Sequence, residues 1–270
     1  MQAVALTIAG SDPSGGAGLQ ADLKTFQQHQ VYGESVVTLL TVQNTRTVSA
    51  LEFVAPPFIL AQLDAVLEDI PPNAAKTGAL GRADIIEALA SRAARFPFPL
   101  VVDPVMISKH GVALLADSAV EALVRRLLPH AFLVTPNLAE ASRLVGFPVD
   151  SRSAMERAAE GIAAMGPRHV LIKAGHRSSD AMDLLWSEGR VTAFAGQRIL
   201  STSTHGTGCT LSAAITARLA RGEELVTAVA LAREYVRAAI RTAPQLGGGQ
   251  GPVNHGAPTG APLPRHHGKD

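Results

Sequence analysis

A glycine-containing loop that runs directly into a helix is the feature that most constrains this chain. Residues 201–210 read STSTHGTGCT, and residues 211–220, LSAAITARLA, repeat apolar side chains every four positions. The first turn of a helix has backbone N–H groups without carbonyl partners and carries partial positive charge. Because Gly206 and Gly208 lack a Cβ, an anion can approach these peptide groups closely. The pattern therefore predicts an anion-binding loop.

Cys209, the single cysteine of the chain, stands at this predicted helix start. A helix N-terminus favours thiolate over thiol, so we expect the pKa of Cys209 to lie below the ~8.5 of free cysteine. An anion cradle beside a potential base is the arrangement that phosphoryl transfer needs. Taken alone, the motif fits a helix cap with a buried cysteine equally well.

Composition limits the classes of protein that this chain can belong to. Its 270 residues, 47% of them hydrophobic, suffice for one large domain or two small ones. A net charge of +1 without a basic stripe argues against nucleic acid and membrane surfaces as partners. One cysteine permits no internal disulfide framework, and residues 1–10 lack the basic start of a signal peptide. We therefore expect a cytoplasmic protein.

A second glycine loop follows the first apolar run. Residues 4–9 read as a buried strand, residues 10–18 read GSDPSGGAG, and residues 19–30 have helical character. A strand, glycine loop and helix in this order form a ligand site in α/β proteins. The loop has neither the Lys-Ser/Thr pair of a Walker A loop nor the register of a dinucleotide fingerprint.

The two loops together resemble a known family. Residues 10–26, GSDPSGGAGLQADLKTF, and residues 205–214, HGTGCTLSAA, are similar to the opening and closing motifs of the hydroxymethylpyrimidine and phosphomethylpyrimidine kinases of thiamine biosynthesis. These kinases belong to the ribokinase-like superfamily, and the resemblance covers residues 2 to about 255. Two long motifs in the right order are more specific than either alone.

The resemblance implies a fold that the alternation of strand and helix patterns also predicts. That fold is a three-layer α/β/α sandwich with a mainly parallel central sheet. We expect one ribokinase-like kinase domain over residues 1–256. Residues 257–270, rich in Pro, Gly and His, are expected to form a disordered tail.

The resemblance also implies an activity. It is ATP-dependent phosphorylation of 4-amino-5-hydroxymethyl-2-methylpyrimidine, followed by phosphorylation of the monophosphate to the diphosphate. The implied cofactors are ATP and Mg²⁺, and the implied assembly is a homodimer.

Five positions are implied to bind the pyrimidine: Gly10, Asp22, Gln43, Ala79 and Val105. The amide of Gln43 offers both a donor and an acceptor, which suits an aminopyrimidine edge, although a solvated strand end remains the alternative. The family often has Met where this chain has Ala79, so we expect a larger pocket here.

A second set is implied to handle the nucleotide and magnesium: Asp103, Asn137, Glu140, Lys173 and Thr204. Asp103 ends a buried strand, where ligands of parallel sheets collect, but it also precedes a proline and fits a turn. Asn137 and Glu140 are three residues apart at a helix start; they fit magnesium held through waters and a helix cap equally well. Lys173 is the candidate phosphate contact.

The implied catalytic group is Gly206, Thr207, Gly208 and Cys209, together with Lys173. The four loop N–H groups hold the moving phosphoryl, and Cys209 removes the proton from the substrate hydroxyl. Three alternatives remain. One is pyridoxal kinase, which has the same fold and a similar substrate. The second is a cysteine hydrolase that pairs Cys209 with His205 or His176, and the third is a nucleotide-binding regulator without catalysis.

Overall fold

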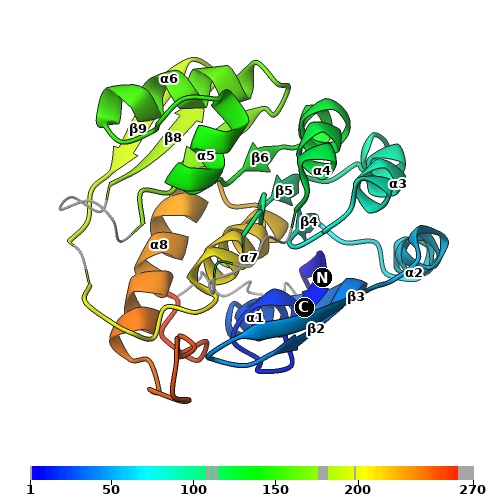
Figure 1. Ribbon diagram of the computed structural model, residues 1–270, viewed down its shortest axis with the longest axis horizontal. Coiled ribbons are helices and arrows are strands. Elements are labelled where there is room, and N and C mark those ends of the chain that lie inside the picture. The colour runs from blue at the N-terminus through cyan, green and yellow to red at the C-terminus, as the bar shows by residue number, and fades with distance from the viewer. Residues whose placement is uncertain (1, 108–110, 112–114, 176–181, 198, 261–270) are drawn as a thin grey trace, which may run out of the picture.

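The computed structural model describes residues 2–107, 111, 115–175, 182–197 and 199–260. These residues form a nine-stranded sheet between two layers of helices (Figure 1). The strands lie in the order β3-β2-β1-β4-β5-β6-β7-β8-β9. Their bounds are β1 Val4–Ser11, β2 Tyr32–Gln43, β3 Val48–Phe53, β4 Ala74–Thr77, β5 Leu100–Val102, β6 Leu133–Val134, β7 His169–Ile172, β8 Asp183–Ser187 and β9 Arg190–Phe194.

The middle of this sheet is parallel and its edges are antiparallel. Strands β2, β1, β4, β5, β6 and β7 pair in parallel, with Ala5 opposite both Gly33 and Ala74. Strand β3 returns antiparallel to β2, and β8 and β9 form an antiparallel hairpin beside β7. The expected mainly parallel sheet is confirmed.

Helices cover both faces of the sheet. Their bounds are α1 Gly18–Gln28, α2 Pro56–Asp69, α3 Ala83–Ala93, α4 Asp117–Ala122, α5 Leu138–Val145, α6 Arg152–Ala163, α7 Thr207–Ala220 and α8 Leu225–Arg241. A π-helical turn, Leu123–Leu127, and a 3₁₀ turn, Leu128–His130, continue α4. Helices α2 to α6 pack on one face, whereas α1, α7 and α8 pack on the other.

Short apolar strands supply side chains to both layers because successive residues point to opposite faces. Val101, Leu133 and Leu171 are buried against α7 and α8. Their neighbours Val102 and Val134 are buried against the layer that contains α3 and α5. The three-layer α/β/α sandwich is therefore confirmed at the level of individual side chains.

The expected domain boundary at residue 256 is wrong. Ala257 is only 1% exposed and packs in the core beside α8. The carbonyl of Thr259 accepts a hydrogen bond from the buried guanidinium of Arg218. The folded unit therefore extends at least to Gly260, because two anchors beyond residue 256 hold the chain; residues 261–270 of the expected tail lie outside the described residues.

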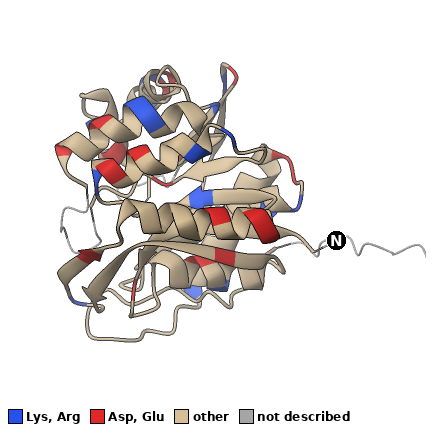
Figure 2. Cartoon of the chain, turned by 90° about the vertical axis from the view of Figure 1, so that its right-hand side faces the viewer, with Lys and Arg blue, Asp and Glu red and all other residues tan. Residues whose placement is uncertain are grey.

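Surface charge and helix hydropathy agree with the composition. In Figure 2, positions of Lys and Arg and positions of Asp and Glu are scattered over the visible helices and strands. Within the part of the chain that the structure describes, no helix combines the length and apolarity needed to cross a bilayer.

Candidate active site

One cavity of about 680 Å³ opens where the parallel strands end. Segments that follow β1, β4, β5, β6 and β7 reach it, as do the end of β2 and the start of α7. The predicted site residues that line it are Gly10, Gln43, Ala79, Asp103, Val105, Asn137, Glu140, Lys173, Thr204, Gly206, Thr207, Gly208 and Cys209. The structure therefore brings together all the predicted positions except Asp22.

Helix α7 begins at Thr207, directly after the left-handed Gly206 (φ 81°). The Thr207 hydroxyl donates to the carbonyl of Thr204 at 3.1 Å, which holds the loop against the first helical turn. The N–H groups of Gly208 and Cys209 belong to this first turn, where an α-helix offers them no carbonyl acceptor. The start of α7 therefore lines the cavity with N–H groups suited to an anion, and anion binding there stays a prediction.

Cys209 is half-buried at this helix start, and its sulfur accepts a hydrogen bond from the backbone N–H of Gly18. Burial raises the pKa of the Cys209 thiol to about 12, and the nearby ammonium of Lys76 only partly offsets this effect. The expectation of a lowered pKa is therefore wrong, because the loss of water outweighs the N-terminal field.

Asp22 also differs from its expected role as a pyrimidine contact. Its side chain is completely buried in α1, where Oδ2 accepts hydrogen bonds from Lys76 Nζ at 2.7 Å and from the Thr7 hydroxyl at 2.6 Å. Lys76, on β4, lines the cavity, whereas Asp22 is not among the residues that reach it. Asp22 therefore holds the buried ammonium of Lys76, which lies near Cys209. Burial opposes the charge of Lys76, but Asp22 and other anions hold its pKa above the ordinary value.

A second buried lysine lies on the nucleotide side of the cavity. Lys173 Nζ is 2.9 Å from Asp103 Oδ1, and a Cβ placed on Gly208 would lie 3.5 Å from the same ammonium. Asp103 Oδ2 accepts a hydrogen bond from the Ser212 hydroxyl at 3.2 Å. Burial opposes the charge of Lys173, but Asp103 and Glu140 raise its pKa above the ordinary value. A permanent cation therefore lies beside the predicted phosphate position.

Asn137 and Glu140 form a reciprocal helix cap at the start of α5. The Asn137 side chain accepts from the N–H groups of Ala139 and Glu140, and Glu140 Oε2 accepts from the N–H of Asn137 at 2.8 Å. Both residues still line the cavity. Burial raises the pKa of Glu140 to about 7, although Lys173 acts in the opposite direction. The two residues therefore do form a helix cap, and the carboxyl group of Glu140 still lies near Asp103.

The carboxylates that line the cavity fit a magnesium ion that is bound together with a nucleotide. No group of three or more His, Cys, Asp or Glu side chains gathers as a metal site among the described residues. Mg²⁺ bound with a nucleotide requires only one or two carboxylates, since phosphates and waters complete its octahedron. Asp103 and Glu140 supply that number of carboxylates.

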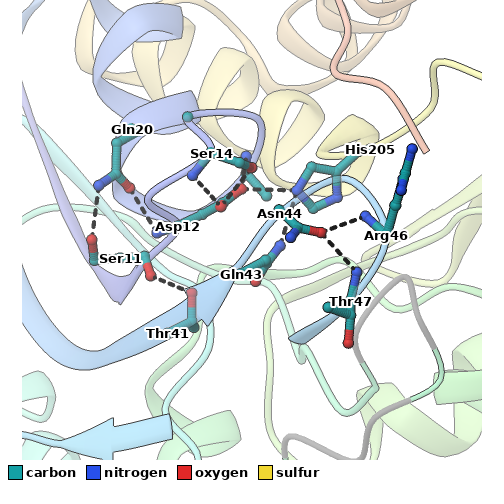
Figure 3. A network of polar contacts seen from close by, with 12 residues as sticks. Ser11, Asp12, Ser14, Gln20, Thr41, Gln43, Asn44, Arg46, Thr47 and His205 are labelled. Carbon is teal, nitrogen blue, oxygen red and sulfur yellow. Dashed lines mark hydrogen bonds and ion pairs between the residues drawn. The ribbon is translucent and has the colours of Figure 1, made fainter. Parts of the chain in front are cut away.

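A polar network that the sequence analysis did not identify joins the two glycine loops (Figure 3). His205 Nε2 lies 2.8 Å from Asp12 Oδ2, and the amide of Gln43 approaches the same nitrogen at 3.0 Å. These contacts of Nε2 give no support to a hydrolase pair of His205 with Cys209, and His176 lies outside the described residues. The DPSGG and HGTGC motifs contain both partners, but only the fold shows that they meet.

Three of the predicted pyrimidine contacts that line the cavity, Gly10, Ala79 and Val105, are small or apolar residues. A Cβ on Gly10 would lie 2.7 Å from Leu39 Cδ1, so glycine is needed for this close approach. Ala79 is held through its carbonyl, which accepts a hydrogen bond from the Thr38 hydroxyl at 2.7 Å, and both Ala79 and Val105 line the cavity. The pocket wall is therefore set by backbone contacts as much as by side chains.

Known proteins share this sequence and this geometry. The thiamine biosynthesis bifunctional protein ThiED of Geobacter sulfurreducens is 48% identical over 93% of this chain, which spans about half of that protein's length. The hydroxymethylpyrimidine/phosphomethylpyrimidine kinase of Rhizobium meliloti is also 48% identical, over 94% of this chain and 97% of its own.

Solved structures agree with these sequence comparisons. A structure of the pyridoxal kinase of Staphylococcus aureus in complex with AMP-PCP and pyridoxal superposes with a TM-score of 0.87 at 36% identity, over 95% of each chain. The family model for phosphomethylpyrimidine kinase matches residues 12–254, which include most of the first glycine loop, the whole of the second and most of the residues that line the cavity. The chain therefore belongs to the phosphomethylpyrimidine kinase family.

Proposed function

We propose that this protein phosphorylates 4-amino-5-hydroxymethyl-2-methylpyrimidine with ATP and then phosphorylates the monophosphate to the diphosphate, as a step of thiamine biosynthesis. One observation carries the proposal. The N-terminus of α7, with Cys209 in its first turn, lies in the same cavity as Gln43, Ala79 and Val105. An anion cradle and a small aromatic-sized pocket thus share one space, as transfer between a nucleotide and a hydroxymethyl group requires.

In the proposed reaction the substrate hydroxyl oxygen attacks the γ-phosphorus while the bond to the ADP oxygen breaks. The N–H groups at the start of α7 and the ammonium of Lys173 stabilise the charge of the moving phosphoryl. Cys209 is the proposed acceptor of the hydroxyl proton; because its pKa is raised to about 12, only the small fraction present as thiolate can accept it. Because phosphoryl transfer passes through a loose transition state, positioning and charge stabilisation supply most of the acceleration.

Magnesium is the proposed metal, and Asp103 and Glu140 are the residues that would hold it, partly through water, with Asn137 fixing Glu140. When bound, Mg²⁺ neutralises charge on the triphosphate. Thr204 lies at the nucleotide side of the loop, where its hydroxyl is 3.4 Å from Gln250 Oε1.

Pyridoxal kinase is the second candidate function, and two observations favour it. The similar structure from Staphylococcus aureus contains pyridoxal, which also carries a hydroxymethyl group on a six-membered ring. Ala79, which lines the cavity, is smaller than the Met that the resembled family often has at this position, and this favours a bulkier ring than the pyrimidine.

A coupled ADP-release assay with Mg-ATP tests both candidates, with the pyrimidine and pyridoxal run in parallel. Turnover of the pyrimidine with mono- and diphosphate products supports the proposal, and turnover of pyridoxal alone transfers it to the second candidate. Absence of ADP with both compounds contradicts both. Cys209→Ala should lower turnover by about 10²–10⁴, and near-normal turnover would contradict its role as base.

We further propose a cytoplasmic homodimer. The outward face of β2 supports this assembly because Leu40 and Val42 are 48% and 60% exposed on one side of the strand. Light scattering on the purified protein measures the mass directly; a mass of 28.1 kDa would contradict the dimer.

A further inference from the structure

The carboxylate of Asp12 is saturated with hydrogen-bond donors. Its Oδ1 accepts from the N–H of Ser14 at 2.9 Å and from the Ser14 hydroxyl at 2.7 Å, and its Oδ2 accepts from the N–H of Ala17 at 2.9 Å. Burial opposes ionisation, but the bonds from His205 and Ser14 outweigh it and hold the pKa of Asp12 below its ordinary value. Asp12 is therefore an acceptor only.

The fourth neighbour of this carboxylate fixes the imidazole of His205. Nε2 lies 2.8 Å from Asp12 Oδ2, and both side chains are about 4% exposed. Because ionised Asp12 has no proton to donate, this contact is a hydrogen bond only when Nε2 of His205 carries the proton. This holds for the neutral ring and for the imidazolium.

The protonated Nε2 in turn fixes the amide of Gln43, which lies 3.0 Å away (Figure 3). A ring nitrogen that carries a proton has no lone pair with which to accept an amide N–H. Rotating the terminal amide of Gln43 by 180° exchanges Oε1 and Nε2, so that the single Nε2–H of His205 is shared between Asp12 Oδ2 and the amide oxygen of Gln43. The amino group of Gln43 then points away from His205, and Gln43 is one of the residues that line the cavity.

We propose that His205 is a positioning residue that holds Gln43 with its amide oxygen toward the imidazole and its amino group toward the substrate. The inference rests on the proposed function for the identity of the substrate. Gln43 then reads a hydrogen-bond acceptor, such as an unprotonated ring nitrogen, and does not read the exocyclic amino group. Asp12, which belongs to the other glycine loop, determines this orientation of the amide because it accepts the hydrogen of His205 Nε2.

The protonated nitrogen of His205 can be observed without any turnover. Nitrogen-15 labelling of the histidines, with two-bond proton–nitrogen correlation spectra, reports which ring nitrogen carries hydrogen. The spectrum of His205→Gln identifies the signals of His205. A proton on Nε2 is expected, and a bare Nε2 with hydrogen on Nδ1 alone would overturn the proposal.

A kinetic comparison tests the direction of the Gln43 contact. Gln43→Glu still accepts from His205 but offers the substrate only acceptors. At pH 8 we expect the KM for the pyrimidine to rise at least about tenfold and the KM for ATP to change less than about twofold. An unchanged or lowered KM for the pyrimidine would show that the substrate donates to residue 43, and would overturn the proposal.

Asn44→Asp is the matched control for the added charge. Asn44 is exposed outside the cavity, and its Oδ1 accepts from the N–H groups of Arg46 and Thr47, which aspartate can also do. Its KM for the pyrimidine should change less than about threefold. If the wild-type protein releases no ADP with the pyrimidine, the proposed function fails, whereas the tautomer of His205 still decides the positioning.

Discussion

Gly206 lies directly against the backbone of Gly16, so that a Cβ on Gly206 would come within 1.8 Å of the Gly16 carbonyl oxygen. The two residues are 190 positions apart and belong to the two glycine loops that border the cavity. This contact fixes the start of α7 relative to the start of α1. The glycine at 206 thus serves the packing of two loops as well as the approach of an anion.

Gly206→Ala should therefore destabilise the protein more than strain alone explains. The left-handed φ of 81° costs a non-glycine residue roughly 1–2 kcal/mol, and the overlap with Gly16 adds to it. Gly222→Ala is the matched control, because Gly222 has a similar φ of 79° and no atom within 4 Å of the added Cβ. In urea unfolding, Gly206→Ala should lower the free energy of unfolding by at least about 1 kcal/mol more than Gly222→Ala does. Equal losses would mean that the contact between Gly206 and Gly16 adds nothing to the effect of the substitution.

Alkylation of the lone cysteine measures the thiol of Cys209 directly. Because burial raises its pKa to about 12, the thiolate fraction should grow about tenfold for each pH unit between pH 8 and 10. The rate of reaction with iodoacetamide should follow it without reaching a plateau. Cys209→Ser removes all labelling and serves as the control. A plateau near pH 8 would show that the helix N-terminus, and not burial, controls this thiol.

Lys76 should contribute measurably to the thiolate that does form. Among the charged groups that act on Cys209, Lys76 favours the thiolate, whereas Asp22 and Asp103 oppose it. The double variant Lys76→Met/Asp22→Asn removes the buried pair without leaving an unpaired charge. Alkylation at pH 9 should slow, but by less than about tenfold, because the loss of Lys76 raises the pKa of Cys209 and the loss of Asp22 lowers it in part.

Lys24→Met is the control for that double variant. Lys24 is also on α1, but its ammonium donates to the carbonyl of Gly15 at the surface. Its alkylation rate should equal that of the wild-type protein. An unchanged rate in the double variant, with normal circular dichroism, would show that Lys76 does not favour the thiolate more strongly than Asp22 opposes it.

The sequence was sufficient for the architecture because each glycine loop or polar strand end marks the carboxyl end of a strand. Gly10, Asp103 and Lys173 could be assigned to one cavity since parallel strands bring those ends together. Lys76 could not, because a lysine in the apolar run AAKTG does not reveal its partner, which lies 54 residues earlier on a helix. Strand β3 was not expected either: three of its six residues are exposed and only Val48 is buried, so hydrophobic patterning is weak.

The roles of Asn137 and Glu140 show a different limit. The spacing of these residues fits a cap and a metal site equally, and the fold uses them as a cap at the mouth of the cavity. No local pattern separates two uses that occur together. The prediction for the pKa of Cys209 was wrong for a similar reason. The burial that raises this pKa depends on the rest of the fold, including Lys76 and Asp22, and not on the loop alone.

Glu140→Gln should change both the pH dependence of stability and the need for magnesium. Burial raises the pKa of Glu140 from 4.5 to about 7, so the folded protein binds this proton more tightly than the unfolded chain. The associated stability is present below about pH 4.5 and is lost as the pH rises through 7. Glutamine keeps the capping geometry without the charge. The variant should gain about 1–3 kcal/mol relative to wild type between pH 5 and 8, and require more Mg²⁺ for half-maximal activity.

Glu34→Gln separates these two effects. Glu34 lies near the start of β2, away from the cavity and opposite Leu6 of β1, and burial with help from Asp69 raises its pKa to about 7. Its variant should gain stability over the same pH interval and keep the magnesium requirement of the wild type. If Glu140→Gln also keeps that requirement, Glu140 has no part in holding the metal.

The carboxyl-terminal segment provides a last prediction, based on its anchors. Tyr235 donates its hydroxyl proton to the carbonyl of His255 at 2.7 Å, and Arg218, 1% exposed, donates to the carbonyl of Thr259. Deleting residues 257–270 removes Ala257 from the core and the carbonyl acceptor from Arg218. Leaving a buried guanidinium N–H unpaired should cost about 1–3 kcal/mol. Deleting only residues 261–270 retains Ala257 and the carbonyl of Thr259. This truncation should leave the unfolding midpoint within about 1 °C of the wild type. Equal midpoints for the two truncations would mean that residues 257–260 contribute nothing to the fold, as the sequence alone had indicated.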